Sequence, residues 1–191
     1  MNELALLDWM QSALRTPGLD QFMIAVTTIG DLGMVWLAMG CALLFSKRYR
    51  TLGIGILVAV ALAGVVTECI LKPMIMRPRP CDVNTSVALL VSHPYGSSFP
   101  SGHTCASFAA FGILLFAQAP RKLTVPAGIL AILIAFSRLY LYVHYPSDVL
   151  AGAVIGLALG WLTVRMYRGF WNNKDRLQPE FSLKAPRKEG R

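Results

Sequence analysis

A long run of apolar residues, TLGIGILVAVALAGVVTECIL, fills positions 51–71 and contains one charged side chain, Glu68. An α-helix needs about 20 largely apolar residues to cross the hydrocarbon core of a bilayer, and this run meets that length. The composition agrees, since 55% of the 191 residues are hydrophobic and 15% are charged, which is more apolar than is usual for soluble proteins. The sequence therefore predicts an all-α, polytopic membrane protein.

Four other segments have the same apolar character, although several carry a polar interruption. The predicted membrane-spanning segments are 21–46, 51–71, 104–120, 123–143 and 149–164. The first contains Asp31 between two nearby glycines, and glycines on both sides of an acid favour a break in a helix. We expect a helical bundle of about five spans, the first of them interrupted near Asp31.

The two ends of the chain differ from this central part. Residues 1–20 place apolar Leu7 and Met10 beside charged Asp8, a composition typical of an amphipathic helix lying in the membrane interface. Residues 171–191 are rich in basic side chains and contain prolines, which favours a flexible tail. We therefore divide the chain into an interfacial helix (1–20), an integral membrane domain (21–170) and a basic cytoplasmic tail (171–191).

The net charge of +8 is explained by where the basic residues lie, so nucleic-acid binding is not expected. Basic residues follow the first predicted span at 47–50, separate the third from the fourth at 121–122, and are dense from 165 onward. Cytoplasmic loops of membrane proteins carry an excess of Lys and Arg. We expect these segments in the cytoplasm, and the segment 72–103 with His144 on the outer side of the cell membrane.

Three short segments on that outer side carry candidate chemistry, and in the last of them Arg138 precedes His144 and Asp148. Pro146 suits the first turn of a helix, which would bring Asp148 close to the imidazole. A carboxylate on one ring nitrogen leaves the other as a nucleophile that can attack phosphorus. Such a pair alone is more often structural, but a charged Arg138 inside an apolar span indicates function, because a bound anion would offset its cost.

The middle segment is Pro100, Ser101, Gly102 and His103. Ser101 is a good N-cap, Gly102 allows close approach to the backbone, and a helix start offers unpaired N–H groups to an anion. His103 is then placed to protonate a leaving group as a general acid. Taken alone, the same four residues would be interpreted as a helix cap.

The first segment runs from Lys72 to Pro80 and supplies cations. Arg79 can hold phosphate oxygens with two donors and Lys72 adds a point charge, whereas the alternative is snorkelling at a helix end. Arg77 is a further cation without an assigned role. Glu68 lies four residues before Lys72, so the two are expected to pair on a helix and hold Lys72 in position.

Taken together, the three segments resemble the motifs of the type 2 phosphatidic acid phosphatase superfamily of membrane lipid phosphatases. That pattern is K-x6-R-P, P-S-G-H and S-R-x5-H-x3-D. It is met at every fixed position from Lys72 to Asp148; the matching residues are Lys72, Arg79, Pro80, Pro100, Ser101, Gly102, His103, Ser137, Arg138, His144 and Asp148.

The resemblance implies a compact helical bundle and a catalytic set of His144, His103 and Asp148. In this scheme His144 forms a phosphohistidine that Asp148 orients, and His103 protonates the leaving group and then activates water. The implied phosphate-binding residues are Lys72, Arg79, Ser101, Gly102 and Arg138. Neither a metal nor another cofactor is expected.

The expected partner is a lipid phosphate in the membrane, with undecaprenyl diphosphate as the first choice and phosphatidylglycerophosphate, phosphatidate or lipid A as alternatives. Two other classes stay open: a phospholipid-binding transporter or flippase, and a metal-dependent hydrolase that uses His93, His103 and His144. The four cysteines have no C-x-x-C spacing and are expected to be packing residues, with a disulfide at Cys81 left open. The sequence does not indicate an oligomeric state.

Overall fold

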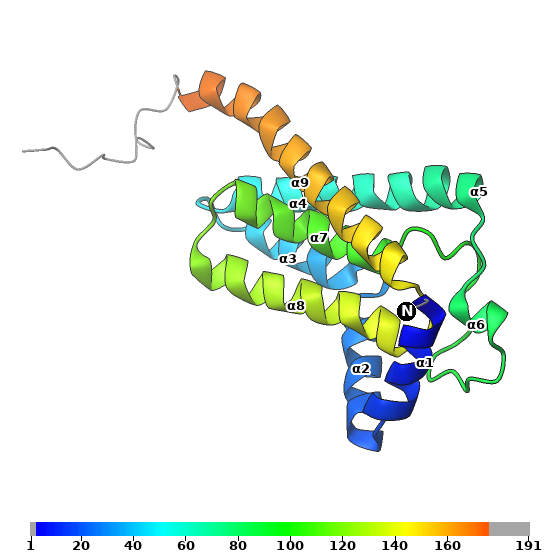
Figure 1. The fold of residues 1–191 in the computed structure, drawn as a ribbon. Helices are drawn as coiled ribbons and strands as arrows, with labels where there is room; N and C mark the ends of the chain where they lie inside the picture. Colours follow the sequence, from blue (N-terminus) through cyan, green and yellow to red (C-terminus); the bar gives the residue numbers. More distant parts are fainter. Residues whose placement is uncertain (1–2, 176–191) are drawn as a thin grey trace, which may run out of the picture.

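The computed structural model describes residues 3–175, with side chains through residue 167, and in this range it is helical without strands (Figure 1). The elements in chain order are α1 (Glu3–Leu14), α2 (Pro17–Ile29), the 3-10 turn η1 (Asp31–Gly33), α3 (Met34–Leu44), α4 (Arg50–Gly64), the π-helix η2 (Val65–Leu71), α5 (Lys72–Ile75), α6 (Pro80–Val83), α7 (Gly102–Phe116), α8 (Arg121–Tyr140) and α9 (Pro146–Asp175). The predicted all-α fold is confirmed.

Three helical segments are long and apolar enough to cross a membrane: Arg50–Val83, Arg121–Tyr140 and Pro146–Tyr167. A fourth span is formed when α2 and the segment from η1 to α3 are taken together, although they are bent by 44°. That bend confirms the predicted break near Asp31. At 15 residues α7 is shorter than a full span, so the expected total of five spans stays a prediction.

Helix α7 lies at the centre of the bundle and packs against α4, α8 and α9. Its contact with α9 is very close, because glycines of α9 lie directly on the α7 backbone. A Cβ at Gly156 would lie 2.4 Å from the carbonyl oxygen of Cys105, and one at Gly152 would lie 2.7 Å from that of Ser101. The starts of α7 and α9, which carry His103 and Asp148, are therefore held together by backbone packing.

The N-terminal segment forms two helices, α1 and α2, which both contact α8 near its C-terminal end (Figure 1). Thr16 caps α2 and Pro17 occupies its first turn, so α1 ends at Leu14 within the predicted 1–20 helix. Leu7 is fully buried, and the Tyr142 hydroxyl donates to the carboxylate of Asp8 at 2.5 Å. Helix α1 is therefore docked on the protein, and its contact with lipid stays a prediction.

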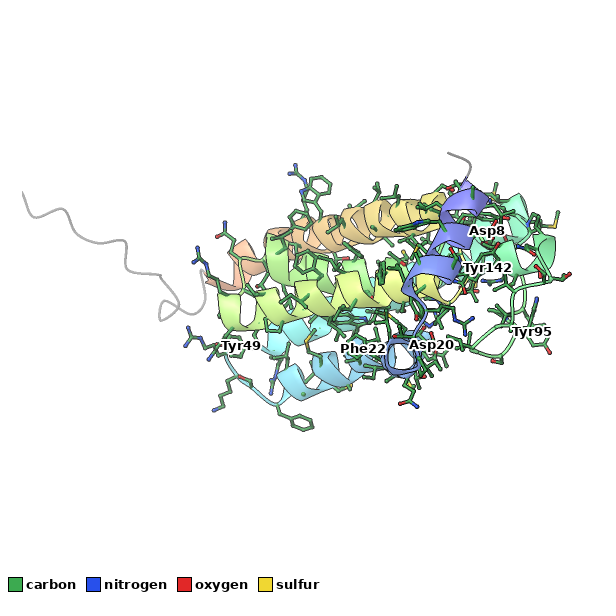
Figure 2. All side chains as sticks on the ribbon, turned by 60° about the horizontal axis from the view of Figure 1, so that its bottom comes forward. Asp8, Asp20, Phe22, Tyr49, Tyr95 and Tyr142 are labelled. Carbon is green, nitrogen blue, oxygen red and sulfur yellow. The ribbon has the colours of Figure 1, made fainter. Side chains whose placement is uncertain are left out.

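The bundle has two chemically different ends. Tyr49, in the basic loop before α4, lies at the end opposite to Tyr95 and Tyr142 (Figure 2). The basic residues at 47–50 thus lie at the opposite end of the bundle from the motif segments, as the charge pattern predicted. Helix α9 continues through Asp175, and the rest of the predicted tail 171–191 lies outside the described residues.

Candidate active site

His144 lies in the loop between α8 and α9 and is 2% exposed, while Asp148 in the first turn of α9 is fully buried. Pro146 begins α9 as the sequence predicted. The expected direct hydrogen bond is replaced by a bridge through Ser98. His144 Nδ1 is 3.6 Å from Asp148 Oδ2, whereas Ser98 Oγ donates to that oxygen at 2.5 Å and lies 3.4 Å from Nδ1. The Nδ1 edge of the ring therefore faces Ser98 and Asp148.

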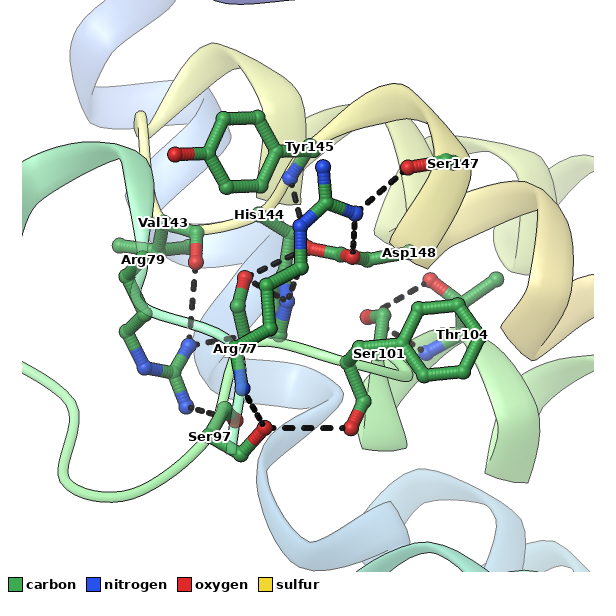
Figure 3. A network of polar contacts seen from close by, with 12 residues as sticks. Arg77, Arg79, Ser97, Ser101, Thr104, Val143, His144, Tyr145, Ser147 and Asp148 are labelled. Atoms are coloured by element: carbon green, nitrogen blue, oxygen red, sulfur yellow. Dashed lines mark hydrogen bonds and ion pairs between the residues drawn. The ribbon is translucent and has the colours of Figure 1, made fainter. Parts of the chain in front are cut away.

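Asp148 is the most heavily bonded acid of the site (Figure 3). Besides Ser98, its Oδ2 accepts from the backbone N–H of Tyr145 at 2.9 Å, and its Oδ1 accepts from Arg77 Nη1 at 2.6 Å. Charge-assisted bonds of this kind hold a carboxylate ionised and in one orientation. Asp148 is therefore a fixed negative charge beside the imidazole.

Arg77 joins three elements through one guanidinium group. Nη1 also donates to Ser147 Oγ at 2.6 Å, Nη2 donates to Glu3 at 2.7 Å, and the group lies 4.0 Å from the ring centroid of Tyr145. Glu3 also accepts from the backbone N–H of Ser147 at 2.7 Å. The start of α1 is thus tied to the start of α9.

Arg79 lies on the other edge of the His144 ring and is 2% exposed. Its Nη1 donates to the Val143 carbonyl at 3.0 Å and is 3.3 Å from His144 Nε2. The remaining donors reach three carbonyls of the loop between α6 and α7; these are the carbonyls of Gly96, Tyr95 and Ser97. The ring nitrogen of His144 that faces away from Asp148 is therefore the one beside a buried cation.

Burial lowers the pKa of His144 to about 3, because an imidazolium loses its hydration there, and the charges of Arg138 and Arg79 act in the same direction. Asp148 opposes the shift. The ring is consequently neutral near pH 7 and retains a lone pair.

The middle segment caps α7 as predicted. Ser101 Oγ accepts from the backbone N–H of Thr104, and the Ser101 N–H donates to the Asp148 carbonyl at 3.1 Å. A Cβ at Gly102 would lie 2.8 Å from Glu68 Oε1, and the same oxygen accepts from Lys72 at 2.6 Å. The predicted Glu68–Lys72 pair is confirmed, and it lies against the start of α7.

Arg138 is 5% exposed, and one of its hydrogen-bond donors lacks an acceptor. Its Nη1 donates to Thr27 of α2, but its Nε is a buried side-chain nitrogen for which the described part of the chain supplies no hydrogen-bond acceptor. Leaving a buried donor of a cation unpaired is costly. Arg138 acts electrostatically on both His103 and His144, so an anion between these groups would supply the missing acceptor.

The three sequence segments therefore meet pairwise at one end of the bundle. Arg79 contacts His144, Ser101 contacts the backbone of Asp148, and the Glu68–Lys72 pair lies against Gly102. A cleft of about 510 Å³ opens beside the first segment and is lined by residues that include Lys72, Arg77 and Ser97. The lining of this cleft does not include Arg79, Arg138 or His144. An anion bound between the three segments would meet the cations Lys72, Arg79 and Arg138, the start of α7 and the neutral imidazole of His144.

One group of potential metal ligands occurs in the described residues: Cys81, Asp82 and His93. Two of the three are exposed, and His93 already pairs with Asp82 at 2.8 Å. None of them belongs to the predicted catalytic or phosphate-binding set, and His93 is not grouped with His103 or His144. The four cysteines are free, which answers the open question at Cys81.

Sequence reasoning missed several residues that hold this site. Arg77 had no assigned role, and Ser98 and Thr27 were not considered. The signal for Arg77 was its place two residues before Arg79 in a proline-stiffened loop. Ser98 and Thr27 gave no signal, because a single hydroxyl in a loop or an apolar helix is common.

The profile of the PAP2 superfamily matches residues 52–172. The chain is 33% identical over 133 residues to the undecaprenyl-diphosphatase of Sulfolobus acidocaldarius, an alignment that covers 69% of this chain and 63% of that protein. The chain thus spans less than two thirds of this relative's length.

Two solved structures have the same fold. The crystal structure of Aquifex aeolicus LpxE superposes with a TM-score of 0.74 at 28% identity, covering 85% of this chain and 94% of that one. The phosphatidylglycerolphosphate phosphatase of Bacillus subtilis superposes with a TM-score of 0.71 at 26% identity, covering 92% and 87%. Motifs, fold and matched length agree, and the chain therefore belongs to the PAP2 superfamily.

Proposed function

We propose that the chain hydrolyses a phosphate ester or diphosphate of a membrane lipid through a phosphohistidine on His144. The observation that carries this proposal is the position of His144 Nε2, 3.3 Å from Arg79 Nη1, while Nδ1 faces Ser98. A neutral imidazole with one edge held by polar partners presents its other lone pair for attack. A substrate phosphoryl group would replace the direct contact between Nε2 and the guanidinium.

In the first step, Nε2 of His144 forms a bond to phosphorus while the bond from phosphorus to the leaving oxygen breaks. The proton that the leaving oxygen needs comes from His103. In the second step, water attacks phosphorus, its proton returns to His103, and the N–P bond breaks to release inorganic phosphate and neutral His144. Asp148 stabilises the positive charge that develops on the ring of His144.

The charge of the transferred phosphoryl group is balanced by Lys72, Arg79 and Arg138, with Ser101 and Gly102 at the start of α7. Cationic side chains of this kind stabilise a phosphoryl transition state by electrostatics. We therefore propose that the reaction needs no divalent metal. Treatment of purified protein with a chelator is expected to leave kcat/KM unchanged, and loss of activity that one divalent ion restores would contradict this part of the proposal.

Undecaprenyl diphosphate is the substrate that we propose first, supported by the similarity to the undecaprenyl-diphosphatase of Sulfolobus acidocaldarius. Phosphatidylglycerophosphate is the second candidate, supported by the structural similarity to the phosphatidylglycerolphosphate phosphatase of Bacillus subtilis. A panel of undecaprenyl diphosphate, phosphatidylglycerophosphate and phosphatidate, compared by kcat/KM in mixed micelles, would rank them. A higher kcat/KM for either phospholipid would overturn the first choice.

The reaction itself is tested by phosphate release from these lipids by wild-type protein and its His144→Ala variant. The variant is expected to lose activity and to form no acid-labile phosphoprotein when phosphorus-labelled substrate is quenched in base. Equal release by the two proteins would rule out the covalent mechanism. Binding of the lipids without release of phosphate by either protein would support a transporter or flippase instead.

We further propose that the site faces the outside of the cell membrane. A single cysteine at Tyr95, which is 95% exposed, can be introduced into a variant without the four native cysteines. An impermeant thiol reagent is expected to label it in intact cells, while a cysteine placed at Lys47 in the opposite basic loop reacts only after lysis. The reverse pattern would contradict the orientation.

A further inference from the structure

The break between α2 and α3 has an irregular backbone that the helical bundle does not require. Leu32 adopts φ 51° and ψ 17°, and Gly33 adopts φ 70°. A leucine in the left-handed region costs about 1 kcal/mol or more. The side chain of Leu32 is also 88% exposed, so its own packing does not repay that cost. Strained backbone that persists in a folded protein points to a role for a neighbouring residue.

The neighbouring residue is Asp31, which the turn directs at the start of α7. Its Oδ1 lies 2.8 Å from His103 Nε2, although the two residues are 72 positions apart. Gly33 fixes the turn in place, because a Cβ there would lie 3.1 Å from Val60 and 3.6 Å from Ala106. The turn is thus packed against α4 and α7, and the carboxylate is delivered to one edge of the His103 ring.

We propose that Asp31 is a positioning residue for His103, which it holds with Nε2 protonated and Nδ1 turned to the leaving oxygen. This inference rests on the proposed function, in which His103 is the general acid. An aspartate on one ring nitrogen fixes the tautomer and favours the protonated ring. His144 is served by Asp148 and His103 by Asp31, so each imidazole of the site has its own carboxylate.

Two cations oppose Asp31 at His103. Arg138 on α8 and Lys72 at the start of α5 are the other charged groups that act on this ring. Both disfavour a second positive charge close by. Burial and the charges of these two residues lower the pKa of His103 from 6.5 to about 4, and Asp31 opposes that shift. Without Asp31, the protonated ring would lose this hydrogen bond. Asp31 therefore raises the fraction of His103 that carries the proton consumed in the first chemical step.

The kinetic test compares wild-type protein with Asp31→Asn, which keeps the shape of the side chain and removes its charge. For an alkyl lipid phosphate, whose leaving alkoxide must be protonated, we expect kcat to fall by about 10- to 100-fold, in line with the size of general acid catalysis, with little change in KM. For nitrophenyl phosphate, whose leaving phenolate needs no proton, the first turnover followed by rapid mixing is expected to be unaffected. Asp31→Glu should recover part of kcat.

The matched control is Asp20→Asn, which removes another acid of the N-terminal segment that pairs with Arg15 and Tyr140 instead. Its kinetics are expected to match the wild type. If Asp31→Asn lowers the rate equally for both leaving groups, or lowers thermal stability in parallel with kcat, Asp31 is a structural residue and the inference is wrong.

A second measurement separates this inference from the proposed function. The chain has 3 histidines, so nitrogen NMR of histidine-labelled protein in lipid can follow His103 once its signal is assigned with His103→Gln. In Asp31→Asn we expect the titration of His103 to move to lower pH by about one pH unit. An unchanged His103 titration would overturn the inference even in a protein that is fully active, and the expected change would support it even if the substrate were not a lipid phosphate.

Discussion

Arg77 offers a direct test of how the proposed catalytic carboxylate of Asp148 is held, because it is the cation that bonds Asp148 Oδ1. The change to make is Arg77→Met, which keeps much of the side-chain volume and removes the guanidinium. Asp148 would then keep Ser98 and the Tyr145 N–H on Oδ2 and lose its partner on Oδ1. A buried carboxylate that loses a charged donor is free to rotate away from His144.

The expected magnitude follows from the geometry. A charge-assisted hydrogen bond contributes about 1.5–3 kcal/mol, but the Arg77 side chain is 28% exposed, so solvent screening reduces the value to about 1.5–2 kcal/mol. At about 1.4 kcal/mol for each factor of ten, kcat/KM is expected to fall by about 10- to 30-fold. Loss of the stacking contact between Arg77 and Tyr145 is expected to add a smaller decrease in kcat/KM.

The assay is steady-state phosphate release from a lipid phosphate in detergent micelles, with thermal unfolding measured on the same preparations. Arg15→Met is the matched control, because the Arg15 side chain is 26% exposed and pairs with Asp20 at 3.2 Å. It removes an ion pair from an arginine of similar exposure that does not contact Asp148, and it should retain full activity. If kcat/KM of Arg77→Met stays within two-fold of the wild-type value, or falls no further than that of Arg15→Met, then Arg77 does not orient Asp148.

The remaining predictions concern protonation, phosphate binding and helix packing. The pKa of His144 is lowered by burial from 6.5 to about 3, so the stability that the neutral ring contributes is present above pH 6.5 and is lost as the pH falls toward 3. Lowering the pH from 7 to 5 should therefore reduce Tm more for the wild type than for His144→Gln. An equal dependence of Tm on pH in the two proteins would contradict this prediction. Arg138→Lys keeps a charge but lacks the Nε donor, so kcat/KM should fall about ten-fold, and a wild-type value would show that Nε contacts no phosphate. Gly156→Ala must displace the α7 backbone and should cost about 1–3 kcal/mol in unfolding measurements, whereas Gly64→Ala, with nothing within 4 Å of its Cβ, should be neutral or stabilising.

Features that depend only on residues close together in the sequence were predictable. The cap at Ser101, the start of α9 at Pro146 and the Glu68–Lys72 pair each depend on positions within four residues, so local rules suffice. The membrane class and the break near Asp31 follow from hydropathy and glycine placement for the same reason. The three motif segments were also recognisable, because each is short and contiguous.

Contacts between distant segments were not predictable in this way. The sequence suggested that Asp148 would bond His144 directly, since the two are one helical turn apart. Ser98 instead bridges them at 2.5 and 3.4 Å, from a loop some fifty positions earlier. Hydrophobic periodicity carries no information on which loop hydroxyl reaches a buried carboxylate, because that depends on how the loop between α6 and α7 folds against the start of α9.

Residues of the N-terminal segment, which lie outside the region matched by the family profile, also form hydrogen bonds with the site. The family profile matches from residue 52 onward, yet three side chains before that position bond three polar residues of the site: Glu3 bonds Arg77, Thr27 bonds Arg138 and Asp31 bonds His103. Glu3 is a third hydrogen-bond partner of the Arg77 guanidinium beside Ser147 and Asp148, Thr27 accepts from the buried Arg138, and Asp31 pairs with the His103 ring. The proposed phosphate-binding residues Lys72, Arg79 and Arg138 are all cationic, so their mutual repulsion disfavours a site without an anion. Asp31 offsets part of that repulsion at Arg138. Among the described residues, Arg138 Nε is a buried side-chain donor without a hydrogen-bond acceptor, and a bound phosphate would supply both the negative charge and that acceptor.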